Sequence, residues 1–348
     1  MKRILVIVYL ILSGCVTTSK NSQCHLNLSR YSPTLKERQI AIDIVDQELA
    51  KESPQIAAVL KRMILDMNHP LNVTESLVFE YTRPETLRQI KQVTQSRLLE
   101  KEQLGIFVKK HPRRLFLFKE VSPEINYQNP RTSRFQAFME DPQRLARVPA
   151  LLADYPISPD EKRLIDMLVV SFNQKVHPAV FKELDQLTCK MREEFPDKLI
   201  VRSRVKNSEG IIDKLKRHFK KPKYNVANIS DAIGARIIVK DVEQLARLYE
   251  LIQDFYGTGA SGRIIEVDNK YVKYNKDDPT YRGISMTIKA PGEHGDITFE
   301  LQLATLRGSI AADMGHNTTY KKILPITKME ERAIMRFKSE AAALEQVN

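Results

Sequence analysis

Residues 202–223 contain nine basic side chains and only two acidic ones, so positive charge is concentrated in this stretch. Lys206, Lys214 and Arg217 recur at helical spacing within this stretch. Such a run can be a solvated helix face, a cradle that neutralises the phosphates of a nucleoside triphosphate, or a nucleic-acid patch. Stacking on nucleic acid favours interleaved aromatic residues, and only two lie nearby, so the first two alternatives are preferred.

Two carboxylates lie close to predicted strands in the same half of the chain. Asp231 directly precedes the apolar run 232–239, and Glu300 and Gln302 fall on one face of the run 297–303 because side chains alternate along a strand. Burying an unpaired charge costs several kcal/mol, so each carboxylate requires a salt bridge, a sheet edge or a metal ion. Beside a basic helix, a magnesium site that handles phosphate is about as well supported as two salt bridges.

The elements that must position these residues alternate between strand and helix patterns. Strands are predicted near 199–201, 232–239, 263–267, 284–289 and 297–303, and helices over 211–219, 241–255 and from about 305 past 320. We therefore expect an α+β domain over residues 196–325, with a mixed sheet of about five strands flanked by helices. Residues 326–348 are expected to form a C-terminal helix.

Residues 33–195 have a mainly helical pattern and contain no catalytic motif. Helices are predicted over 33–67, 84–99, 160–172 and 178–195, and the Pro- and Arg-rich stretch 111–142 is predicted to be a loop. The role of this region stays open.

The N-terminus has the pattern of an export signal. Lys2 and Arg3 precede an apolar run that ends in Leu-Ser-Gly before Cys15, which resembles the lipobox of bacterial lipoproteins. We expect a signal peptide over residues 1–14, a lipid anchor on Cys15 and a polar tether over 15–32, the alternative being an ordinary signal peptide with a chance cysteine. The expected location is therefore a membrane surface outside the cytoplasm, and the outer membrane where the cell has one.

Composition sets wider limits. The 348 residues are enough for two domains, and their formal net charge of +12 suggests an anionic partner such as nucleotide, nucleic acid or lipid headgroups. Beyond Cys15, Cys24 and Cys189 could pair in an oxidising compartment or remain free, and no cysteines or histidines have zinc-site spacing. The oligomeric state is not indicated.

Four motifs occur in order between Lys198 and Lys322. They are Arg204-Val-Lys206 with Lys214, the strand that begins Asp231-Ala-Ile-Gly, the segment Tyr281-Arg282-Gly283, and Glu300-Leu-Gln302 with the helix that follows. Together these motifs resemble the RelA/SpoT nucleotidyltransferase domain, which transfers pyrophosphate from ATP to the 3′-hydroxyl of a nucleotide.

The resemblance implies roles for these side chains. Arg204, Lys206, Lys214 and Arg217 would bind ATP, and Tyr281, Arg282 and Gln302 would bind the acceptor. Asp231 and Glu300 would be the catalytic pair and would hold Mg²⁺, with Glu300 also taking the proton of the attacking hydroxyl. The implied partners are ATP and an acceptor such as GDP, GTP or an adenine nucleotide.

Most departures from the family pattern fall on the acceptor side. Ser285 stands where the family has His, Ala304 where it has Arg, Gly210 where it has Ser, and Gly315 where it has Glu. The residues expected to bind ATP therefore match the family pattern better than those expected to bind a guanosine acceptor. The chain has no His-Asp dipeptide of the kind found in the hydrolase half of long family members, so no alarmone hydrolysis is expected.

Export conflicts with the need for ATP, and three readings follow. The chain could be a toxin or effector that acts in another cell, where a nucleotide or a nucleic-acid 3′ end would be the acceptor. It could be retained inside as an alarmone synthetase, or it could be a non-catalytic envelope lipoprotein with a degenerate nucleotide site.

Overall fold

A computed structural model describes residues 34–65, 82–100, 104–111, 159–191, 199–218, 231–258, 261–275, 278–294, 297–320 and 324–347, with residues 102, 194–195, 229 and 322. The expected signal peptide, Cys15, the tether and most of the predicted loop 111–142 lie outside these residues. Among the helices described, none is both long enough and apolar enough to cross a membrane.

A five-stranded mixed sheet forms the centre of the molecule, as the sequence predicts. Its strands run in the order β1-β2-β5-β4-β3. The two central strands, β2 and β5, are parallel to each other, and the other neighbours are antiparallel. The strands are β1 (Ile200–Val205), β2 (Ile233–Val239), β3 (Ile264–Asn269), β4 (Ile284–Lys289) and β5 (Thr298–Thr305).

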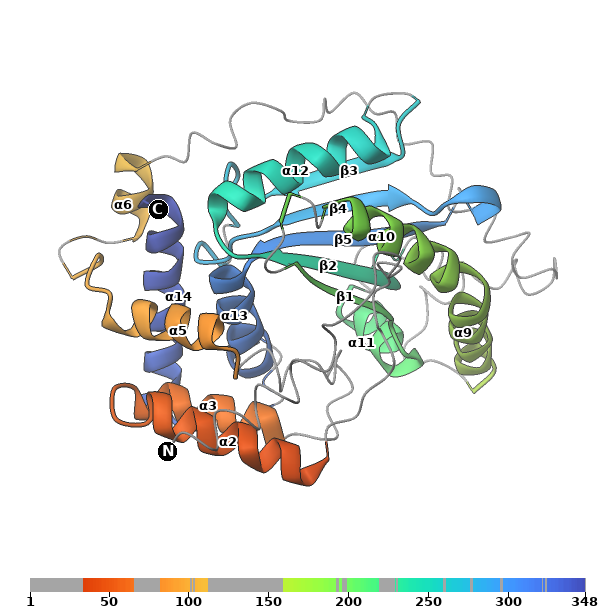
Figure 1. Cartoon of the computed structure of the whole chain (residues 1–348). Helices are drawn as coiled ribbons and strands as arrows, with labels where there is room; N and C mark the ends of the chain where they lie inside the picture. The colour runs from red at the N-terminus through yellow and green to blue at the C-terminus, as the bar shows by residue number, and fades with distance from the viewer. Residues whose placement is uncertain are drawn as a thin grey trace, which may run out of the picture.

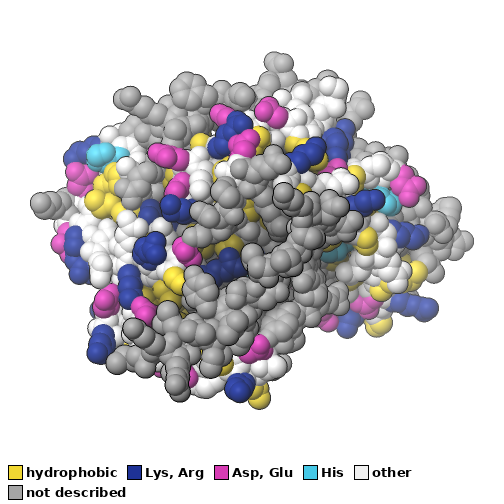
Figure 2. Space-filling view, in the orientation of Figure 1, with side chains coloured by type: hydrophobic (Ala, Val, Ile, Leu, Met, Phe, Trp, Pro, Cys, Tyr) yellow, Lys and Arg dark blue, Asp and Glu magenta, His cyan; other side chains and the backbone are white. Residues whose placement is uncertain are grey.

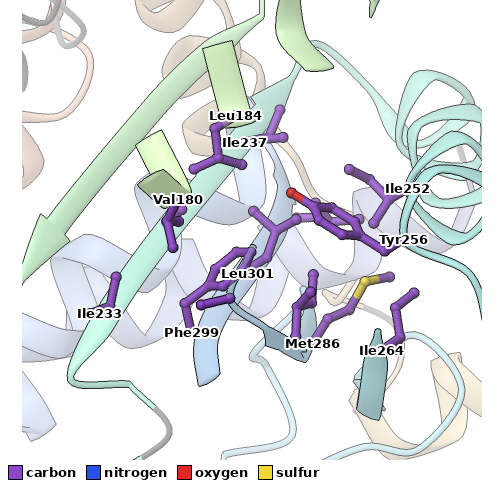
Figure 3. Close-up of a cluster of buried hydrophobic side chains, with 14 of the residues drawn as sticks. Val180, Leu184, Ile233, Ile237, Ile252, Tyr256, Ile264, Met286, Phe299 and Leu301 are labelled. Atoms are coloured by element: carbon purple, nitrogen blue, oxygen red, sulfur yellow. The ribbon is translucent and has the colours of Figure 1, made fainter. Parts of the chain in front are cut away.

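One face of the sheet is apolar and packs against helices. Helix α12 (Val242–Tyr256), whose N-terminus is capped by Asp241, and helix α10 (His177–Met191) cover this face (Figure 1). Leu184 of α10 and Tyr256 of α12 project toward the inward-facing side chains of β2 and β5 in Figure 3. Helix α11 (Ser208–His218) follows β1, and Ile211 belongs to the same core.

A second core joins the two ends of the chain. It is formed by helices α2 (Leu35–Leu49), α3 (Pro54–Leu65), α5 (Pro84–Gln95), α13 (Leu306–Gly315) and α14 (Lys328–Val347). The short helix α6 (Leu104–Lys110) lies against α14, and Ile238 of β2 connects this core to the sheet. A π-helical turn, η5 (His316–Tyr320), continues α13.

The predicted helices are present, but two of them are joined, one further helix occurs, and the N-terminal helices pack in two separate cores. The helices predicted over 160–172 and 178–195 are one run, α9 (Pro159–Ser171) and α10, joined by the π-helical turn η2 (Phe172–Val176). Helix α6 was not predicted, because seven residues give too short a pattern to identify. The helices of region 33–195 also divide between two cores, since α9 and α10 pack on the sheet whereas α2, α3 and α5 pack with α14.

Candidate active site

The face of the sheet opposite α10 and α12 carries two rows of mostly polar residues. Strand register aligns Arg202, Arg236, Gln302, Ser285 and Asp268 in one row and Arg204, Gly234, Glu300, Thr287 and Glu266 in the next. Since neighbouring residues of a strand point to opposite faces, the intervening residues of β2 and β5 belong to the apolar core. Basic residues thus gather at the β1–β2 side of this face, and acidic or hydroxyl residues at the β4–β3 side.

Asp231 lies between two lysines at the start of β2. Its Oδ2 accepts a hydrogen bond from Lys206 Nζ at 2.8 Å. Its Oδ1 forms an ion pair with Lys214 Nζ at 2.6 Å, without the angle of a hydrogen bond. Lys206 directly follows β1, where its backbone N–H bonds to the carbonyl of Ala232 at 2.8 Å, and Lys214 lies on α11. Antiparallel pairing of β1 with β2 therefore brings together groups that are far apart in the sequence.

Burial makes this cluster electrostatically strong. Burial alone would raise the pKa of the Asp231 carboxyl, but attraction to Lys206 and Lys214 and the hydrogen bond from Lys206 outweigh it and hold that pKa well below its usual range. Burial lowers the pKa of Lys206 to about 8, even though Asp231 favours its charged form. The side chain of Lys206 is only 7% exposed. The three groups are therefore a preformed charged cluster in a poorly solvated site.

Glu300 is held by hydrogen bonds in the middle of the same face. Its Oε1 accepts from Ser285 Oγ on β4 at 2.7 Å, and its Oε2 accepts from the side-chain amide of Gln302 at 3.0 Å. Arg204 on β1 interacts electrostatically with Glu300, and burial lowers the pKa of its guanidinium although Asp231 and Glu300 favour its charged form. A side chain at Gly234 would stand between the two, with its Cβ 4.0 Å from Arg204 Nε.

A second buried ionic network adjoins Gln302. Arg236 donates to Gln302 Oε1 from Nε at 2.9 Å and from Nη2 at 2.7 Å, and its Nη1 bonds to Asp313 Oδ1 at 2.9 Å. Arg202 Nη1 binds the other oxygen of Asp313 at 3.1 Å. Burial would raise the pKa of Asp313, but the two arginines outweigh burial and lower it.

Sequence reasoning did not select Arg202, Arg236 or Asp313 as site residues. The sequence did contain a signal for Arg202, because it lies two residues before Arg204 and so points to the same face of the strand. Asp313 could not be found in this way, since only the return of α13 across the sheet face places it there.

Of the expected acceptor residues, two meet the cluster and one does not. Tyr281 lies near Glu300 and Arg236, and burial raises the pKa of its hydroxyl. Gln302 touches Glu300 directly. Arg282 points elsewhere: its Nη1 bonds to the carbonyls of Pro279 and Tyr281, and its guanidinium lies 4.6 Å from the ring centre of Tyr274. Its role in acceptor binding stays a prediction.

Arg217 lies on α11, one turn beyond Lys214, and its side chain is outside the described part.

The carboxylates of the site are suitable ligands for magnesium. No set of three or more metal-binding side chains occurs in the described residues. Mg²⁺ commonly takes one or two carboxylates and completes its shell with water and substrate phosphates. Asp231 Oδ1, a buried oxygen without a hydrogen bond of good geometry, and Glu300 on the neighbouring strand meet that requirement once a nucleotide supplies its phosphates.

Comparison with known proteins supports this reading of the four motifs. Residues 203–323 match the family model described as the region found in RelA/SpoT proteins, a span that includes all four motifs. No curated protein matched the chain.

Solved structures similar to this chain include the small alarmone synthetase 1 from Bacillus subtilis, with 20% identity, 51% of this chain and 90% of that chain covered, and a TM-score of 0.39. The same enzyme bound to its product pppGpp has 18% identity, 53% and 93% coverage and a TM-score of 0.40. A GTP pyrophosphokinase family protein from Streptococcus pneumoniae has 17% identity, 54% and 91% coverage and a TM-score of 0.38. Residues 203–323 of the chain thus match the region found in RelA/SpoT proteins, and this span includes Asp231 and Glu300.

Proposed function

We propose that this protein transfers pyrophosphate from ATP to the 3′-hydroxyl of a nucleotide, in a reaction of the (p)ppGpp-synthesising type. The observation that carries this proposal is one charged cluster: Lys206 and Lys214 pair with Asp231, and Arg204 interacts electrostatically with both Asp231 and Glu300. Several fixed cations beside two carboxylates are what phosphoryl transfer requires, because its catalysis is mainly positional and electrostatic.

On the ATP side, binding of ATP would change the partners of the two lysines from Asp231 to the phosphates. Lys206 and Lys214 now neutralise Asp231. When ATP arrives, its phosphates offer these lysines more negative charge than one carboxylate does, and Arg204 and Arg217 would complete the cradle. Asp231 would then be free to hold Mg²⁺ together with Glu300. The metal would supply charge neutralisation on the phosphates, and the chain's own side chains would fix their position.

On the acceptor side, Glu300 would take the proton of the 3′-hydroxyl. The freed 3′-oxygen forms a bond to the β-phosphorus of ATP, the bond from that phosphorus to the oxygen of the α-phosphate breaks, and AMP leaves. Ser285 and Gln302 hold the two oxygens of Glu300 and so keep it oriented toward the acceptor. Tyr281 would stack on the acceptor base, and a hydroxyl at Ser285 in place of the family's imidazole would alter which base fits.

We further propose that the protein is an exported lipoprotein anchored through Cys15. Cys189 is disulfide-bonded, with its partner outside the described residues, and disulfides persist mainly in oxidising compartments. An exported synthetase would find ATP only in another cell, which favours the toxin or effector reading. Mass spectrometry of the membrane fraction, without reduction, tests both points: we expect an acylated Cys15 peptide and a linked Cys24–Cys189 peptide. Unmodified Cys15 would contradict the anchor.

The nucleic-acid alternative has less support on the visible surface. Figure 2 shows Lys and Arg side chains interspersed with Asp and Glu over the described residues on the side of the molecule in view. Nucleic-acid binding favours a continuous basic surface instead. A 3′ end of RNA nevertheless remains one outcome of the test below.

The decisive experiment uses residues 20–348 with Mg²⁺, radiolabelled ATP and GDP, GTP, ADP, ATP or tRNA as acceptor, resolved by thin-layer chromatography. A labelled pyrophosphorylated product with release of AMP is expected, and it identifies the acceptor. ATP binding without product from any acceptor would refute the transferase and indicate a binding protein on a degenerate catalytic fold.

A further inference from the structure

The loop in front of Tyr281 is fastened to the C-terminal helix. Lys338 on α14 donates from Nζ to Asp278 Oδ2 at 2.8 Å, and its side chain is only 8% exposed. The stem of Lys338 packs on Gly315, where an added Cβ would come within 3.0 Å of it. Asp278 Oδ1 in turn accepts from the backbone and the hydroxyl of Thr280. One carboxylate therefore shapes residues 278–280 and ties them to α14.

The last turn of α14 makes a second connection to the same segment. Glu345 Oε2 accepts from Tyr271 Oη at 2.9 Å, and its Oε1 lies 3.5 Å from Arg307 Nη1 in a pair that is almost fully buried. With its amide turned to satisfy both neighbours, Gln346 accepts from Arg282 Nε at 3.2 Å. Arg282 donates to the carbonyl of Tyr281 at 2.9 Å. The backbone of Tyr281 is thus two hydrogen bonds from α14.

The N-terminal helices hold α14 in place. Ser96, at the end of α5, donates to Glu340 Oε2 at 2.7 Å, and Arg62 of α3 pairs with Glu330 at 2.5 Å. Apolar side chains of α2, α3 and α5 share one core with Ile334 and Phe337 of α14. In Figure 1 α5 crosses α14 and α13 lies beside it, and α14 contacts α5, α6 and α13. A hydrogen bond, a partly buried ion pair and a shared apolar core therefore hold α14 against the N-terminal helices.

We propose that α14, backed by the helices of residues 35–110, is the element that positions Tyr281 for the acceptor, with Lys338 and Gln346 as positioning residues. This inference rests on the proposed function and gives the N-terminal helices a role in it. The loop before Tyr281 joins the edge strand β3 to its neighbour β4. Such a loop is ordinarily the mobile part of a fold, whereas an aromatic ring that must hold a base requires a fixed backbone. The contacts of α14 provide that constraint, and α14 lies outside the four sequence motifs.

The test compares Lys338→Met, which keeps the stem and removes the charge, with Lys338→Arg, which restores it. Lys328→Met is the matched control, because Lys328 is an exposed lysine on the same helix. We expect Lys338→Met to raise the KM for the acceptor about tenfold, in line with the loss of one charged hydrogen bond. The KM for ATP should stay unchanged, Lys338→Arg should recover most of the loss, and Lys328→Met should behave as wild type.

Asp278→Asn provides an independent arm, since Asp278 lies on the loop and is the partner of Lys338. It should match Lys338→Met, and the double variant should be no worse than either single one, as expected for two residues acting through one contact. Equal changes in the KM for ATP and for the acceptor, or additive effects in the double variant, would overturn the proposal.

Equilibrium binding of a fluorescent acceptor nucleotide separates this proposal from the proposed function. If the wild-type chain makes no product, the transferase fails. Unweakened nucleotide binding by Lys338→Met would then refute the positioning role separately.

Discussion

The proposed donor half of the sheet face and the proposed acceptor half are built by different means. On the β1–β2 side, buried ion pairs between Asp231 and two lysines, and between Asp313 and two arginines, fix the groups in place. On the β4–β3 side, the described contacts of Glu300 are hydrogen bonds from the neutral side chains of Ser285 and Gln302. A triphosphate has the same charge whatever base it carries, whereas acceptors differ in their bases.

This difference bears on one departure from the family pattern, Ser285 in place of His, because Ser285 contacts Glu300. Charges that neutralise phosphate cannot be exchanged without loss, because an unpaired buried charge is costly. Neutral hydrogen-bonding groups can be exchanged at lower cost, and each exchange alters which acceptor fits. The two halves should therefore respond differently to substitution.

Glu300→Gln should produce the largest effect, because it removes the proposed base while keeping the size of the side chain. We expect transfer to fall about a hundredfold to ten-thousandfold, the range that a general base contributes. AMP release measures the loss, and circular dichroism checks the fold. Glu266→Gln is the control, since Glu266 is an exposed carboxylate in the same row of the sheet face. An undiminished rate in Glu300→Gln would exclude Glu300 from proton transfer.

Lys214→Met tests the donor half and should rank second. It removes one of two cations from Asp231, and we expect kcat/KM for ATP to fall about tenfold to a hundredfold, as the loss of one charged contact to phosphate predicts. The KM for the acceptor should hardly change. Lys240→Met, an exposed lysine beyond the end of β2, is the control. If the acceptor KM rose as much as the ATP KM, the two halves would not be separable.

Ser285→Ala tests the acceptor half and should have a smaller effect. It removes one hydrogen bond to Glu300, and we expect the transfer rate to fall about threefold to tenfold. Equilibrium binding of ATP should be unchanged, because Ser285 lies on β4 and has no described contact with the lysine cluster. Weakened ATP binding in this variant would show that the halves are coupled through Glu300.

Much of this arrangement follows from local sequence. Apolar and β-branched runs predicted β2, β4 and β5, and the basic helix predicted over 211–219 carries Lys214, which meets Asp231. Asp313 was missed because its position depends on how α13 folds back onto the sheet, which no local pattern encodes, whereas Arg202 points to the same strand face as Arg204 and could have been selected. The direction of Arg282 was missed because one of its partners is Gln346, which lies more than sixty residues later in the chain.

The pH dependence of ATP binding tests the proposed donor half without changing its shape. Burial lowers the pKa of Lys206 to about 8, and bound phosphate favours the charged form, so binding takes up a proton when the free lysine is neutral. Affinity for ATP should therefore be constant well below pH ~8 and weaken above it, by at most about tenfold per pH unit. Lys206→Arg should remove this dependence, because an arginine stays charged throughout that range. Fluorescent ATP-analogue titrations from about pH 6 to about pH 9.5 would measure both proteins, within the range where lysine titration matters. An identical slope in Lys206→Arg would assign the titration to another group and leave Lys206 without a direct role in holding phosphate.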